Sequence, residues 1–357
     1  MGSKHFRTAR NTLCCVAFAL AVGAASGAGQ SSSSSSASKA IDAKADIKTQ
    51  KPTSSDPNVS ITPRIRPAPD AGNDRREANI RIDTNVVLVN VSVTTPLNQF
   101  VTGMEKEHFR IFEDKVEQKI QTFGSIDAPI SVGLVFDASG SMGPKLVKSR
   151  QAASQFFKTA NPDDEFFLVQ FNDRPELVVP FTTNTEEIQN RLTFTQAKGR
   201  TSLLDALYLA MHEMKKARNP RKAVLILSDG GDNASRYTES EIRNLVREAD
   251  VQVYAIGIFE PMASRGRTTE EMSGPGLLSE LAEQTGGRHF PVDNINELPD
   301  VSAKIGIELR NQYVIGYSPI NQERDGKYRR ISVKLVQPKG LPPLRPTFRQ
   351  GYYAPSQ

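Results

Sequence analysis

The chain has 357 residues, which is enough for two domains with a sizeable core. Hydrophobic residues make up 38% of it, and its formal net charge is +5. Lys4, Arg7 and Arg10 supply three of these charges, so the rest of the chain carries only +2 (5 − 3). Such a balance does not support nucleic-acid binding through a general basic surface.

The first 28 residues predict a secretory signal peptide. A basic start is followed by an apolar run over residues 13–25 and by small residues up to Ala28. The run is short for a membrane span, so cleavage after Ala28 is favoured over an uncleaved anchor helix. We therefore expect a secreted or periplasmic protein whose mature chain has no transmembrane segment and, because Cys14 and Cys15 lie in the signal, no disulfide.

Residues 29–78 predict a disordered linker, because serine, proline and charged residues dominate and apolar periodicity is absent. It would be either a spacer that tethers the folded part or a simple tail. The first strand is expected in TNVVLVNVSVTT, where alternate valines share one face. Further short strands around a turn at 113–115 extend this β unit over residues 79–127.

Residues 128–310 predict an α/β fold, because strands alternate with helices along the whole segment. Its strand segments are ISVGLVFD, EFFLVQF, ELVVPF, KAVLILSDG, VQVYAIGIF and HFPV. Its helical segments are PKLVKSRQAASQFFKTA, TEEIQNRLTF, SLLDALYLAMHEMKKA, TESEIRNLVREA, GLLSELAEQTGG and INELPDVSAKIGIELRN. The unbroken apolar strands indicate a doubly wound, mostly parallel, Rossmann-like sheet that is covered on both faces.

Residues 311–357 return to a β pattern in QYVIGYSP, YRRISVKLV and PTFRQGYYA. Two independent β units would each have few strands and a thin core. We therefore expect a single small β-sandwich, built from the segments on both sides, into which the α/β domain is inserted.

The stretch FDASGSMG, residues 136–143, follows the first buried strand and carries the chemistry. It lacks the G-x-S-x-G of a nucleophile elbow and the glycine spacing of a phosphate-binding loop. Asp137, Ser139 and Ser141 alternate along it, so their side chains can point to one side. Their oxygens suit Mg²⁺, or Mn²⁺ or Ca²⁺, and Thr201 and Asp229 are placed on other loops to complete the shell.

This pattern resembles the metal-ion-dependent adhesion site (MIDAS) of von Willebrand factor type A domains. The resemblance covers residues 128–310, and the flanking β segments with FRQGYYAP resemble secreted bacterial proteins related to this family. It implies that Ser139, Ser141 and Thr201 offer hydroxyl oxygens to the ion. It also implies that Asp137 and Asp229 bind the ion directly or through water, and that a partner's Asp or Glu fills an open position.

The expected function is therefore a secreted, metal-dependent adhesion or interaction module, and not an enzyme. The alternative is an envelope scaffold protein whose ion only stabilises the fold. A metal-dependent hydrolase is disfavoured because no general base is apparent beside the serines. Asp205 is expected to cap or solvate its helix rather than bind the ion, and the loop 260–276 either tunes partner choice or merely connects.

Overall fold

The computed structural model describes residues 86–125, 127–259, 269–338, 340 and 342–356, with the backbone alone for 269–273. The predicted signal peptide, the linker of residues 29–78 and most of the loop 260–276 lie outside the described residues. None of the described helices combines the length and apolar character that crossing a membrane requires.

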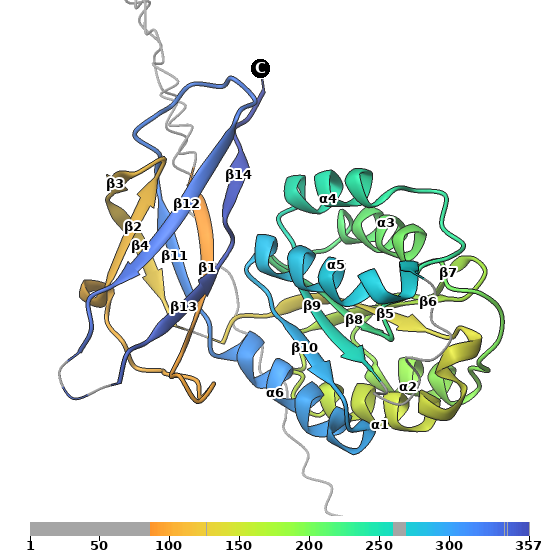
Figure 1. The fold of residues 1–357 in the computed structure, drawn as a ribbon. Coiled ribbons are helices and arrows are strands. Elements are labelled where there is room, and N and C mark those ends of the chain that lie inside the picture. Colours follow the sequence, from red (N-terminus) through yellow and green to blue (C-terminus); the bar gives the residue numbers. More distant parts are fainter. Residues whose placement is uncertain (1–85, 126, 260–268, 339, 341, 357) are drawn as a thin grey trace, which may run out of the picture. The chain divides into compact units, whose positions relative to one another are not determined.

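The middle of the chain forms a six-stranded sheet with the order β10-β9-β8-β5-β6-β7 (Figure 1). Its strands are β5 (Ile130–Asp137), β6 (Glu165–Phe171), β7 (Pro175–Thr182), β8 (Arg221–Ser228), β9 (Gln252–Ile258) and β10 (His289–Val292). All neighbouring pairs are parallel except β6 with β7. Every residue of β5 is buried, as its unbroken apolar sequence requires. The predicted doubly wound, mostly parallel sheet is confirmed.

Helices cover both faces of this sheet (Figure 1). One apolar cluster joins the sheet to α1 (Leu146–Phe157), α2 (Thr185–Thr193) and α6 (Leu298–Arg310). The other joins it to α3 (Leu203–Met214), α4 (Glu239–Glu248) and α5 (Thr269–Thr285). Sequence signals set some of these helix starts: Thr238 and Glu241 form a capping box for α4, and Asn184 caps α2. Short 3₁₀ turns precede α1 and α6 at η2 (Gly140–Lys145) and η4 (Ile295–Glu297).

The flanking segments form two further four-stranded sheets, ordered β13-β1-β11-β4 and β14-β12-β2-β3. Their strands are β1 (Val87–Thr94), β2 (Phe109–Glu113), β3 (Val116–Gln118), β4 (Ile120–Gly124), β11 (Tyr313–Tyr317), β12 (Tyr328–Leu335), β13 (Arg345–Phe348) and β14 (Gly351–Tyr353), with the turn η1 (Lys106–His108) before β2. Each sheet mixes strands from before and after the α/β domain, and an apolar cluster takes side chains from both sheets. The flanking β-sandwich is confirmed, whereas the domain limits at residues 79, 128 and 311 stay predictions.

A buried polar network also joins the two halves of the sandwich. Glu113 of β2 accepts hydrogen bonds from the hydroxyls of Tyr317 and Tyr352, each at 2.8 Å, and pairs with Arg329 at 3.4 Å. Burial, followed by the bond to Glu113, raises the pKa of Tyr352 to about 12, so its hydroxyl stays a donor. Because Glu113 precedes the α/β domain and its partners follow it, the network can form only when both segments are in place.

Two elements differ from the sequence prediction. PTFRQGYYA, expected as one strand, divides into β13 and β14, which belong to different sheets. Between them the Gln350 N–H donates to the carbonyl of Gln284 on α5, at 3.2 Å. Helix α5 starts at Thr269, before Pro275, rather than at the expected GLLSELAEQTGG.

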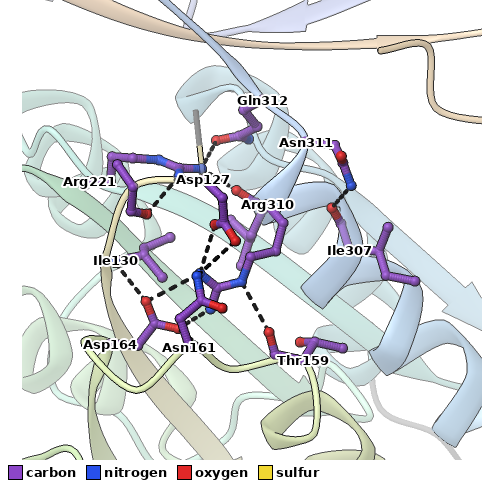
Figure 2. A network of polar contacts seen from close by, with 12 residues as sticks. Asp127, Ile130, Thr159, Asn161, Asp164, Arg221, Ile307, Arg310, Asn311 and Gln312 are labelled. Atoms are coloured by element: carbon purple, nitrogen blue, oxygen red, sulfur yellow. Dashed lines mark hydrogen bonds and ion pairs between the residues drawn. The ribbon is translucent and has the colours of Figure 1, made fainter. Parts of the chain in front are cut away.

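Arg310, the last residue of α6, ties together the places where the chain enters and leaves the α/β domain (Figure 2). Its guanidinium pairs with Asp164 and, at 3.0 Å, with Asp127. Asp164 is fully buried and also accepts the N–H groups of Ile130, at 2.9 Å, and Asn161, at 2.7 Å. The ion pair is therefore a desolvated one, supported by additional hydrogen bonds.

Arg221, at the start of β8, makes a second tie beside the first (Figure 2). Its guanidinium donates to the carbonyls of Ala128, at 3.0 Å, and Leu309. It also contacts the side chain of Gln312, which precedes β11. The two arginines therefore fix both connections to the sandwich through charge-assisted hydrogen bonds.

We predict that Arg310→Met destabilises the protein by about 3 kcal/mol, because it leaves the Asp164 carboxylate buried without its counter-ion. Urea unfolding followed by far-UV circular dichroism measures the change. The matched control is Lys327→Met, which removes a charge from an exposed pair with Asp325 and should leave the unfolding midpoint unchanged within error. Equal midpoints for Arg310→Met and the wild type would contradict the prediction.

Candidate metal centre

The candidate centre lies at the carboxyl end of β5, where the sheet changes its winding direction. From β5 the chain crosses to β6 on one side, and β8 later adds on the other side. In such sheets the loops that diverge at this point leave a place for a ligand. Phe136 is in register with Leu227 of β8, so Asp137 and Ser228, the next residue on each strand, end at the same level.

Asp137 is fully buried and its two carboxylate oxygens have separate partners. Oδ1 accepts the N–H of Ser139 at 2.8 Å, and Oδ2 accepts the hydroxyl of Ser228 at 2.6 Å. The Ser228 hydroxyl in turn accepts the N–H of Gly230 at 3.0 Å. These bonds hold the carboxylate between the loop that follows β5 and the loop that follows β8.

Ser139 and Ser141 place their hydroxyl oxygens 3.1 Å apart. Ser139 is buried and has an extended backbone, whereas Ser141 is exposed in the first turn of η2. The two side chains therefore lie on the same side of the loop, beside Asp137. Such an arrangement offers two neutral oxygen donors next to a carboxylate.

Backbone bonds bring the loop that carries Thr201 beside this one. The N–H of Gly140 donates to the carbonyl of Gly199 at 3.0 Å, and the N–H of Lys198 donates to the carbonyl of Ala138 at 2.9 Å. Gly199 has φ +79°, and a Cβ there would lie 2.4 Å from a carboxylate oxygen of Asp173, so only glycine fits. Thr201 itself is buried, and its N–H donates to the Asn233 side chain at 3.0 Å.

Asp229 follows β8 and forms an ion pair with Lys145, whose Nζ lies 3.0 Å from Oδ2. The side chains of Lys145 and Asp229 are only 5% and 11% exposed. Sequence reasoning identified neither Lys145 nor Ser228 as part of this centre. The signal for Ser228 is its place directly before Asp229 at the end of a buried strand. Nothing in the local pattern of Lys145 separates it from an ordinary lysine at a helix start.

Two other acidic residues support the neighbouring loops. The carboxylate of Asp232 accepts the N–H of Leu204 at 2.9 Å, in the first turn of α3. Asp205 instead accepts the N–H groups of Arg236, at 2.8 Å, and Tyr237, at 3.1 Å. Of the two roles expected for Asp205, capping its own helix is wrong, because its carboxylate turns towards the loop before α4 and Asp232 bonds the start of α3. The other role, solvating its helix, stays a prediction.

The electrostatics of the centre disfavour two ionised carboxylates side by side. Burial, followed by the nearby Asp229 carboxylate, raises the pKa of Asp137 to about 7 against the opposing hydrogen bonds from Ser139 and Ser228. A divalent ion beside both carboxylates would relieve this like-charge repulsion. Hydroxyl and carboxylate oxygens are also the ligands that Mg²⁺, Mn²⁺ and Ca²⁺ prefer, so the residues fit such an ion.

The fold and the centre together define a class: a doubly wound α/β domain whose strand-end loops gather carboxylate and hydroxyl side chains at the switch point. Comparison with known proteins gives this class its family. Residues 132–231 match the von Willebrand factor type A domain.

Curated relatives match parts of the chain. An uncharacterized protein of Borreliella burgdorferi is 23% identical over 222 residues, which are 56% of this chain and 65% of that protein. Inter-alpha-trypsin inhibitor heavy chain H4 of Bos taurus is 30% identical over 134 residues, which are 34% of this chain and 15% of that protein. The chain thus spans less than two thirds of the length of either relative.

Solved structures to which the chain is similar include a von Willebrand factor type A protein from Catenulispora acidiphila. It has 12% identity and a TM-score of 0.45, and the match covers 77% of this chain and 74% of that one. Proximal thread matrix protein 1 from the mussel byssus, solved with a zinc-occupied MIDAS motif, has 20% identity and a TM-score of 0.42. That match covers 55% of this chain and 49% of the mussel chain.

The raised pKa of Asp137 predicts how the stability of the metal-free protein depends on pH. Between roughly pH 4 and pH 7 the folded state keeps a proton on Asp137 that an unfolded aspartate has released. Protons therefore favour the folded state in this range. In EDTA, the free energy of unfolding of the wild type should fall with rising pH relative to Asp137→Asn, and the difference should level off above about pH 7.

Urea unfolding of both proteins at a series of pH values measures this difference. Asn keeps the size of the side chain and an oxygen that can accept the Ser139 N–H, and its amide N–H can donate to the Ser228 hydroxyl, so the substitution removes the titration and reverses one hydrogen bond. Parallel pH profiles for the two proteins would contradict the raised pKa.

Proposed function

We propose that this protein is an exported interaction or adhesion module that captures a carboxylate-bearing protein through a divalent cation. Asp137, Ser139, Ser141, Thr201 and Asp229 would hold the ion, with Mg²⁺ first and Mn²⁺ or Ca²⁺ as alternatives. The bound ion would supply an electrophilic position for an Asp or Glu side chain of the partner. The chain's own residues would hold the ion and leave that position open.

One observation carries the proposal: the Asp137 carboxylate, the Ser139 and Ser141 hydroxyls and the Asp229 loop converge at one strand end, joined by the bonds through Ser228. The donor set also has the right charge. Two carboxylates cancel a divalent ion only formally, and hydroxyls add no charge, so the ion would still attract an anion. The like-charge repulsion on Asp137 supports a cation at this place.

The histidine contacts support a binding role over a hydrolytic one. His108 accepts the N–H of Glu105 at 3.1 Å, exposed His212 stacks on Tyr208, and His289 packs on Phe259. None of these contacts of the described histidines involves Ser139 or Ser141. A serine nucleophile needs a base within hydrogen-bond reach, so we propose that the protein is not an enzyme.

Export is proposed from the sequence alone, because the basic and apolar start of the chain has the pattern of a cleaved signal peptide. The near-neutral mature chain supports a protein partner rather than a nucleic acid. We propose the linker of residues 29–78 as a spacer between the envelope and the folded part.

We predict that Thr201→Val weakens Mg²⁺ binding by more than about tenfold, because it replaces the hydroxyl with a methyl group of similar size. Loss of a residue that only supports a metal ligand already weakens metal binding by about tenfold or more. Isothermal titration calorimetry measures the affinity. Thr193→Val is the matched control, because the hydroxyl of Thr193 bonds only within α2, to the Gln189 carbonyl at 2.9 Å. Equal affinities of Thr201→Val and the control would exclude Thr201 from the shell.

A pull-down from envelope and secreted fractions, in Mg²⁺ or in EDTA, separates the proposed module from a scaffold protein. We expect a partner that wild type retains in Mg²⁺ and loses in EDTA, and that Asp137→Ala does not retain. A partner that stays bound in EDTA, while the thermal unfolding temperature falls, would favour the scaffold alternative.

A further inference from the structure

Lys145 forms a buried ion pair inside the candidate metal centre. Its Nζ lies 3.0 Å from Oδ2 of Asp229, and its side chain is only 5% exposed. The helix that it precedes keeps it there: the Ser149 hydroxyl donates to the Lys145 carbonyl at 3.1 Å, and the neighbouring Met142 and Leu146 are buried. A buried ammonium next to Asp229, a proposed ligand of the ion, changes the net charge of the centre.

The formal charges show the effect. With both carboxylates ionised, Asp137 and Asp229 alone give −2, so a divalent ion would bring the centre to neutrality. With Lys145 the centre carries −1, and a divalent ion brings it to +1. Because both members of the Lys145–Asp229 pair are buried, salt in the solvent screens this charge only weakly. The ion alone is then left with an uncompensated positive charge, which an anionic ligand removes.

We propose that Lys145 makes the centre bind its divalent ion and an anionic ligand together, rather than the ion alone. The inference rests on the proposed function and adds a specificity-determining residue to it. Lys145 competes with the ion for the Asp229 carboxylate and so weakens binding of the ion by itself. By linkage, an anion that binds the ion-loaded centre strengthens ion binding, and the ion strengthens anion binding by the same factor.

The test measures Mn²⁺ binding by the electron paramagnetic resonance signal of free Mn²⁺, at constant ionic strength. Acetate serves as the carboxylate probe and acetamide as its uncharged counterpart, with Mn²⁺–acetate binding in buffer subtracted. In wild type, excess acetate should tighten Mn²⁺ binding by at least about fivefold, the lower end of measured couplings, and acetamide should not. Equal effects of acetate and acetamide on the wild type would overturn the inference.

Variants of Lys145 give the second arm. Lys145→Met keeps the apolar stem and removes the charge, so it should bind Mn²⁺ at least about fivefold more tightly without acetate and lose most of the acetate effect. Lys145→Arg keeps the charge and should keep the acetate effect. Lys158→Met removes an exposed lysine at the far end of α1 and should behave as wild type.

The outcomes separate the inference from the function on which it rests. Mn²⁺ binding that Asp137→Ala leaves unchanged would overturn the metal centre itself. Binding that depends on Asp137, with unchanged or weaker affinity in Lys145→Met, would overturn the role of Lys145 alone. Circular dichroism checks the fold of each variant. If Lys145→Met does not fold, equal effects of acetate and acetamide on the wild type would still overturn the inference.

Discussion

The ion pair between Arg310 and Asp164 is the interaction on which the two-part architecture depends, because it holds the start and the end of the α/β domain together. The sandwich strands on either side, β4 and β11, pair directly, with Gly124 in register with Val314. A domain inserted between paired strands must begin and end close together. Arg310 and Arg221 hold the two ends of the domain together, because they bond residues beside both connections to the sandwich.

The candidate centre lies at the opposite end of the same strands, and the sheet connects the two places. Asp164 bonds the first residue of β5, and Asp137 is its last. A buried parallel strand has little freedom to shift its register, because β5 is paired with β6 along one edge and with β8 along the other. The polar groups at the two ends of β5 are therefore held at a fixed separation by one rigid element.

Much of this fold follows from the sequence, because strand burial and helix periodicity are local properties. Val89, Val91 and Val93 alternate into the sandwich core as their spacing predicts. The failures involve contacts distant in sequence. The break between β13 and β14 depends on the bond from Gln350 to α5. The early start of α5 depends on Gly274, where a Cβ would lie 1.6 Å from the Gly230 carbonyl oxygen, so the helix backbone packs directly on the loop after β8.

The candidate centre likewise has one part that the sequence predicts and one part that it does not. The alternation of Asp137, Ser139 and Ser141 is visible in eight residues. Lys145, in contrast, is recognised as part of the centre only from its contact with Asp229, which lies 84 positions later. Average composition hides such a charge, since the chain without its first residues is close to neutral. A surface patch of lysines would attract any anion and be screened by salt, whereas one buried ammonium acts at a single place. Selectivity for an anionic ligand would then come from a single desolvated charge set beside the ion by the packing of α1, and not from the overall basicity of the protein.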